Sequence, residues 1–215
     1  MKKFKALLVV ACALLLVAAS VFGTMAYLTS TDEVKNTFTV GKVKITLNEA
    51  KVNADGTPVA NAERVKANEY KLLPGHTYTK DPTVTVEEGS ESSYVKMTVT
   101  FSKASALDAI FAPTGAELTS IFNGYDATNW IYKGNTKDAT ADTRTYEFWY
   151  KETAGAPTAD VALDALFDSI TVPGTITGDQ LKTIGGMTIT VNAYAIQADG
   201  FANATAAWEA FTPNP

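Results

Sequence analysis

Apolar and polar residues alternate with a period of two along most of the chain, which is typical of β-strands with one buried face. The clearest stretch is 94–101, where Val95, Met97, Val99 and Phe101 alternate with polar residues. The residue types agree, because β-branched and aromatic side chains fit a pleated, half-buried surface. Further strands are expected at residues 42–47, 83–86, 129–132, 143–152, 169–172 and 187–196.

Between residues 102 and 126 the apolar spacing changes to three and four, which indicates short amphipathic helices. The first contains Leu107 and Phe111, and the second contains Ile121 and Phe122 and is expected to end at Gly124. Shorter helical turns are expected at 162–168, 178–183 and 202–211. Strands with helical inserts and no regular β–α alternation predict a mainly β fold, an antiparallel jelly-roll-like β-sandwich.

The N-terminus has the pattern of an export signal. Lys2, Lys3 and Lys5 precede an uncharged run at 6–22, and small residues stand at Thr24 and Ala26. This pattern predicts a signal peptide at 1–26, cleaved between Ala26 and Tyr27, followed by one domain at 27–215. The alternative is an uncleaved membrane anchor, because the apolar run is only slightly shorter than a spanning helix.

Charge and cysteine content limit the partners and the compartment. The full chain has 18 basic and 23 acidic residues, and loss of the three N-terminal lysines leaves 15 basic residues, a net charge of about −8. This acidity argues against nucleic acid and anionic lipid as partners, so membrane contact is expected only through the uncleaved signal peptide. Cys12 is the only cysteine and leaves with that peptide. An exported domain without disulfides indicates a Gram-positive bacterium and a secreted, extracellular or cell-surface location.

The sequence offers little for catalysis, and we predict no catalytic, cofactor-binding or metal-binding residue. His76 is the only histidine and follows a Pro-Gly turn, so a turn residue is expected there. The acidic loop at 87–91 and the pair Asp138 and Asp142 lack the ordered spacing of a calcium loop. An aromatic group is interpreted mainly as core, with a carbohydrate platform as the alternative; it consists of Tyr146, Phe148, Trp149 and Tyr150.

Three stretches resemble the TasA and camelysin (CalY) family of biofilm fibre proteins. The first is "GTMAYLTSTDEVKNTFTVGKVKITLNEA" at residues 23–50, across the expected cleavage site. The others are "LLPGHTYTKDPTVTVEEGSESSYVKMTVTF" at 72–101 and "VNAYAIQADGFANATAAWEAF" at 191–211. The resemblance implies a jelly-roll subunit that a SipW-type signal peptidase releases and that polymerises with copies of itself in the extracellular matrix.

The resemblance also gives a role to the segment that follows the cleavage site. Residues 27–40 are the candidate donor strand, which pairs with the sheet of the next subunit in donor-strand complementation. An exposed strand edge accepts such a strand through its unpaired N–H and C=O groups. Its apolar residues are Tyr27, Leu28, Val34, Phe38 and Val40.

Three alternatives stay open at this point. Residues 36–40 can instead extend the subunit's own first strand. The family also implies a camelysin-like cell-surface metalloprotease, although the chain has no recognisable zinc-binding motif. The third alternative is a monomeric surface adhesin or glycan-binding module that uses Trp149.

Overall fold

The computed structural model describes Cys12, residues 41–112 and residues 120–211. The chain divides into two units, Met1–Val40 and Gly41–Pro215. The second unit is mainly β, with antiparallel sheets and short helices, as the alternation of the sequence predicts. All elements named below belong to this second unit.

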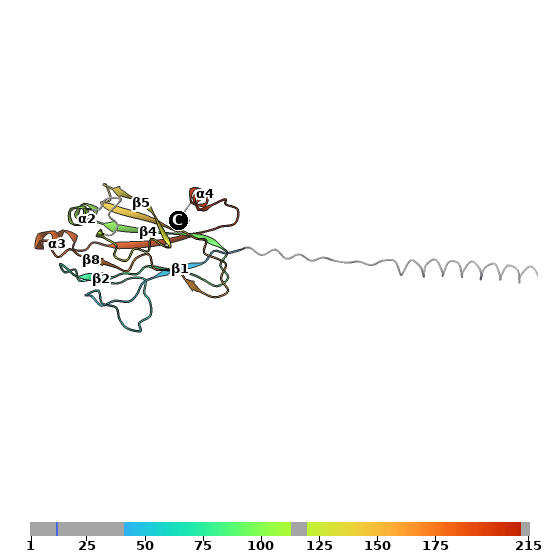
Figure 1. The fold of residues 1–215 in the computed structure, drawn as a ribbon, viewed down its shortest axis with the longest axis horizontal. Coiled ribbons are helices and arrows are strands. Elements are labelled where there is room, and N and C mark those ends of the chain that lie inside the picture. Colours follow the sequence, from blue (N-terminus) through green and yellow to red (C-terminus); the bar gives the residue numbers. More distant parts are fainter. Residues whose placement is uncertain (1–11, 13–40, 113–119, 212–215) are drawn as a thin grey trace, which may run out of the picture. The chain divides into compact units, whose positions relative to one another are not determined.

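A four-stranded antiparallel sheet is the largest part of the fold (Figure 1). Its order is β5 (Trp130–Asp138), β6 (Thr143–Tyr150), β4 (Ser93–Ser102) and β9 (Ile189–Gln197). The central strand β4 follows the predicted alternation, because its apolar residues are fully buried while the intervening polar residues are only half-buried. These buried residues are Val95, Met97, Val99 and Phe101.

Two smaller sheets pack against the inner face of the four-stranded sheet. One has the order β1 (Ile45–Asn48), β3 (Thr83–Val86) and β7 (Val161–Ala162). The other pairs β2 (Thr77–Thr79) with β8 (Ser169–Thr171). Val84 and Val86 of β3 share one apolar core with the inward residues of β4 and β6. Burial of this shared core stabilises the packing of the sheets on one another.

Aromatic rings fill the centre of the core. Phe122 contacts four other rings, with centroid distances of 4.6 Å to Phe167 and 5.2 Å to Tyr146. Edge-to-face and tilted pairs of this kind stabilise a core beyond the area that they bury. Phe122 therefore joins the segment after α2 to strand β6 and to the chain before β8.

The helices close the ends of the sheets (Figure 1). α2 (Ala104–Phe111) buries Leu107 and Phe111, and α3 (Gly178–Ile184) buries Ile184. α3 begins with a capping box in which Thr177 and Gln180 exchange hydrogen bonds, which satisfies backbone donors of its first turn. α4 (Ala204–Ala210) lies on the outer face of the large sheet, where the ammonium of Lys96 is 4.7 Å from the ring centroid of Trp208.

Some expectations about elements are wrong. Residues 162–168 form no helical turn, because this segment is extended along β3: Leu163 donates to the carbonyl of Val84 and Leu166 to that of Pro82. Gly124 lies in a turn after the bridge between Asn123 and Ser169 rather than at a helix end. Most of the second predicted helix lies outside the described residues.

Candidate functional site

The residues predicted for cleavage and for polymerisation lie outside the described part of the chain. They are Ala26, Tyr27, Leu28, Val34, Phe38 and Val40. The described residues do show what such a strand needs as a partner, which is a sheet edge beside an apolar surface. Two edge strands of the second unit, β9 and β1, meet this requirement.

Strand β9 is an edge of the four-stranded sheet, and its backbone is bonded on one side. The N–H of Ser102 donates to the carbonyl of Thr188, and the N–H of Ala198 donates to that of Ser92. In an antiparallel ladder, alternate residues turn their backbone groups to opposite sides, so the even-numbered residues of β9 bond β4. The odd-numbered residues turn their N–H and C=O groups away from the sheet; in the apolar part of β9 these are Ile189, Val191, Ala193 and Ala195.

Strand β1 is the corresponding edge of the three-stranded sheet. The carbonyl of Lys44 accepts from the N–H of Glu87, so the even-numbered residues of β1 face β3. The backbone groups of Ile45 and Leu47 therefore point to the other side. The next residue of this set, Glu49, forms a two-bond bridge with Val65. Within residues 41–112 and 120–211, β1 thus offers a short edge without a strand partner, which ends at Glu49.

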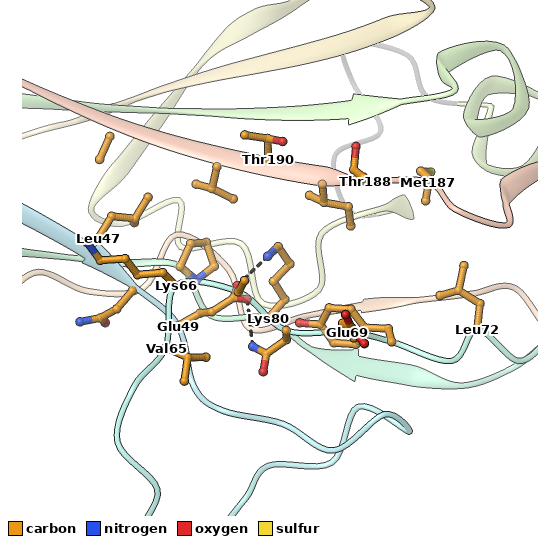
Figure 2. A pocket seen from close by; sticks show the side chains of 18 of the residues that line it. Leu47, Glu49, Val65, Lys66, Glu69, Leu72, Lys80, Met187, Thr188 and Thr190 are labelled. Atoms are coloured by element: carbon orange, nitrogen blue, oxygen red, sulfur yellow. Dashed lines mark hydrogen bonds and ion pairs between the residues drawn. The ribbon is translucent and has the colours of Figure 1, made fainter.

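An open groove of about 1200 Å³ lies between these two edges. β1 forms one wall and β9 the other, as Figure 2 shows, and residues 65–72 complete the groove. Ile45 and Leu47 line it from β1, and Val191 and Ala193 line it from β9. The apolar residues of both walls contact the core but are only partly buried, whereas the inward residues of β4 are fully buried. The apolar interior between the two sheets is therefore incompletely filled at this side.

At one end the groove continues into a small apolar hole of about 40 Å³. Leu72, Met187 and Ile189 line both the groove and the hole. Phe111 of α2 and Ile184 of α3 are among the residues that form the rest of its wall. An apolar side chain that lies over this hole from the groove is thereby removed from water.

A buried ion pair lies between the apolar part of the groove and this hole. The ammonium of Lys80 donates to Oε2 of Glu49 at 2.6 Å, and each side chain is 8% exposed. The amide of Asn68 donates to the other carboxylate oxygen of Glu49 at 2.9 Å. The same buried environment, with the charge of Glu49, raises the pKa of the neighbouring Tyr70 hydroxyl well above its ordinary value. Lys66 and Glu69 also line the groove but are exposed, so Glu49 and Lys80 are its buried charged position (Figure 2).

Sequence reasoning missed both the ion pair and the second wall of the groove. Glu49 and Lys80 are separated by a stretch that reads as a polar loop, so no local pattern connects them. The position of β9 was predicted, but alternation identifies the buried face of a strand and not its neighbours. The composition of β9 could have indicated an unprotected edge, because this strand contains no charged residue, glycine or proline.

The residues with other candidate chemistry have structural roles. His76 is exposed and directly follows the turn at Pro74 and Gly75, as predicted. Asp138 accepts from the N–H groups of Thr140 and Ala141. Asp142 accepts from the backbone and hydroxyl of Ser105 at the start of α2, and these hydrogen bonds lower its pKa. Within residues 41–112 and 120–211, no group of three or more His, Cys, Asp or Glu is placed to hold a metal ion.

The aromatic group of β6 is divided between the two faces of the sheet. Tyr146 and Phe148 are fully buried in the core, as expected for packing residues. Trp149 lies on the opposite face, where the ammonium of Lys133 is 4.1 Å from its ring centroid and the Trp208 ring is 6.2 Å away. The ring of Trp149 is therefore occupied by neighbours on this face.

Comparisons of the chain with protein-family models, with curated proteins and with solved structures found no match. A search of the described residues for a helix of sufficient length and apolarity to cross a membrane found none.

Proposed function

We propose that the chain is a secreted structural subunit that polymerises into extracellular matrix fibres. Residues 27–40, freed by cleavage after Ala26, enter the groove of the next subunit as a donor strand. In this proposal the sheets form a jelly-roll-like β-sandwich that lacks one strand. The observation that carries the proposal is the open, partly apolar groove between the edges of β1 and β9, which are unpaired among the described residues.

The chemistry of the two edges supports strand addition. An incoming strand gains main-chain hydrogen bonds from the outward N–H and C=O groups and buries its apolar side chains against the core. The contact is head-to-tail, because the donor segment and the groove are different surfaces of the same chain. Such contacts build open filaments when their rotation does not close. The resemblance to the TasA and camelysin family supports the same assignment.

Electron microscopy of purified residues 27–215 tests the proposal. We expect fibres from this chain and none from residues 41–215. A triple variant, Val34→Ser, Phe38→Ser and Val40→Ser, should also form none, because it removes apolar area from one face of the segment. The matched control replaces the same number of residues on the opposite face, Lys35→Ser, Thr37→Ser and Thr39→Ser. It should still form fibres.

Other results would contradict the proposal. A chain 27–215 that stays monomeric at high concentration would exclude fibre formation by this segment. Chelator-sensitive cleavage of casein by fibre-free protein would favour the metalloprotease, and glycan binding that Trp149→Ala abolishes would favour the adhesin. N-terminal sequencing of the secreted protein checks that it begins at Tyr27.

A further inference from the structure

The groove presents different chemistry along its length. From left to right in Figure 2 the lower wall passes from Leu47 to Glu49 and Lys80 and then to Leu72. The upper wall runs from Thr190 to Thr188 and Met187 in the same direction. Lys66 and Glu69 on this wall are exposed, so Glu49 and Lys80 form its buried charged position, which lies between the apolar residues of β1 and the apolar hole. The groove can therefore distinguish between registers of an incoming strand.

The charged position is incompletely satisfied by the described residues. An ammonium carries three N–H donors, and that of Lys80 has one acceptor, Oε2 of Glu49. A water molecule can accept from the remaining donors while the groove is open. An apolar side chain placed over Lys80 would displace that water and leave buried donors unpaired, which is costly. A side chain with an acceptor oxygen avoids this cost.

The segment before β1 carries one such side chain on its apolar face. In an extended strand alternate residues share a face. The even-numbered face at the end of the segment has the order Val34, Asn36, Phe38 and Val40, so a single polar residue stands among apolar ones. The amide of Asn36 offers a carbonyl acceptor for Lys80 and N–H donors for Glu49.

We propose that the Glu49–Lys80 pair sets the register of the donor strand by receiving Asn36, so that Phe38 lies over the apolar hole. This inference rests on the proposed function, since it concerns how the same groove selects its strand. A buried polar pair that fixes register at some cost in stability has precedent in other assemblies. Glu49 and Lys80 are therefore specificity-determining residues of the groove.

The structure also assigns a direction to the incoming strand. β1 runs toward Glu49, and the subunit's own N-terminal segment leaves at the other end of β1, near Ile45. In an open filament the neighbour's segment comes from the Glu49 end, so that its residue 40 lies beyond the hole. The donor then runs parallel to β1 and antiparallel to β9. This direction gives the more stable antiparallel pairing to β9, which is the longer of the two edges.

Insertion into the subunit's own groove needs the opposite direction. The segment would have to turn back and run antiparallel to β1, which brings Val34 rather than Phe38 to the hole. The backbone of Lys42 and Lys44 is bonded to residues 87–91, so the chain continues straight beyond β1. A reversal must therefore fall before Lys42, within the residues that the groove needs. This geometry favours exchange between subunits.

Disulfide mapping tests register and direction together. The chain 27–215 contains no cysteine, because Cys12 is the only one and precedes the cleavage site. Protein with Phe38→Cys is mixed with protein carrying Met187→Cys, assembled under reducing conditions and then oxidised. We expect covalent dimers from this pair and few from the control pair, Val34→Cys with Met187→Cys.

The other cross-links overturn the inference in distinguishable ways. Fibres that cross-link Val34→Cys to Met187→Cys between chains show the opposite direction. The same link within one chain, in protein that carries both cysteines, shows self-insertion. Fibres that cross-link Asn36→Cys to Met187→Cys show a shifted register. In the interchain cases the proposed function stands. Absence of fibres from the unmodified chain instead contradicts the proposed function itself.

A second measurement tests the role of the ion pair directly. Asn36→Val should raise the critical concentration for assembly roughly tenfold to a hundredfold, because it leaves Lys80 and Glu49 without a polar partner. Thr37→Val, on the opposite face, should leave it unchanged. In an acceptor with Glu49→Leu and Lys80→Met the effect of Asn36→Val should disappear. Assembly of Asn36→Val at the unmodified concentration would overturn the proposal.

Discussion

The four-stranded sheet has two edge strands of equal length that differ in how their edges are protected. β5 carries Lys133 and Lys137, and a bulge at Gly134 interrupts its register with β6. β9 contains no charged residue and pairs with β4 through nine successive positions without a shift. Lysines and bulges are the usual means by which proteins prevent edge-to-edge association. β5 therefore carries features that disfavour association, and β9 lacks them.

Side-chain contacts reinforce this difference. At the β5 side, the carboxylate of Asp108 on α2 binds Lys137 of β5 and Arg144 of β6, each at 2.8 Å. These bonds hold the end of β5 against the helix. At the β9 side, the buried Glu49–Lys80 pair lies inside the groove and leaves the strand edge free. The Asp108 cluster therefore holds an edge strand in place, whereas the Glu49–Lys80 pair lies along the groove.

The largest expected effect comes from removing an outward N–H of β9. Ala193→Pro deletes a donor that points away from β4, and proline is tolerated where the N–H faces outward on an edge strand. We expect a folded domain that no longer forms fibres at concentrations where the unmodified chain does. Electron microscopy and circular dichroism measure the two properties.

The control for this variant is Ala193→Val, which is similar in size and retains the N–H. It should assemble. If Ala193→Pro forms fibres as readily as Ala193→Val, the edge of β9 is not the site of strand addition, and the contrast with β5 has no functional meaning.

The second expected effect concerns the two ion clusters. Lys80→Met leaves the carboxylate of Glu49 buried without its charge partner, which should lower the free energy of unfolding by about 3–5 kcal/mol. Lys80→Met combined with Glu49→Leu removes both charges and should be close to neutral, within about 1 kcal/mol. Denaturant unfolding in the Ala193→Pro background measures both without interference from assembly. Equal losses in the single and double variants would show that the pair is not electrostatically coupled.

The smallest expected effect is a pH dependence at the β5 side. Burial alone would raise the pKa of Asp108, but its bonds to Arg144 and Lys137 outweigh burial and hold that pKa below its ordinary value. Stability from this carboxylate is therefore present above the unfolded pKa of about 4 and is lost as the pH falls through the lower folded pKa.

Asp108→Asn should cost about 1 kcal/mol near neutral pH, since its partners are partly solvated, and less in acid. Unfolding at a series of pH values in the Ala193→Pro background checks this expectation. A cost that stays constant below pH 4, about the unfolded pKa of an aspartate, would contradict the assigned role of Asp108.

The sequence predicted the elements with strong alternation better than the edges. β3 and β4 were located closely because their apolar residues all face one core. β5 was expected to end at residue 132, yet it continues to Asp138. Gly134, Asn135 and Lys137 read as loop residues, and an edge strand protected against association uses the same residue types. The residue pattern alone therefore does not distinguish a protected edge strand from a loop.

Other parts depended on contacts that local patterns do not contain. Leu163, Leu166 and Phe167 have helical spacing, but this segment is bonded to β3 and to Pro82, which precedes it, through the N–H groups of Leu163 and Leu166. Their side chains are buried, and an extended buried segment can show the same apolar spacing as a helix. To predict the groove, one must know which strands are neighbours in space. To predict the Glu49–Lys80 pair, one must know a contact between residues 31 positions apart. The donor segment, in contrast, was identified from sequence and remains a prediction.

The partly filled interior has a consequence for how fibres of this kind come apart. If each subunit receives from its neighbour the strand that completes its core, binding and folding stability are thermodynamically linked. Interior subunits of a fibre are then the most resistant to heat and proteases. The terminal subunit with a vacant groove is the weakest, so erosion should start there and proceed in a single direction.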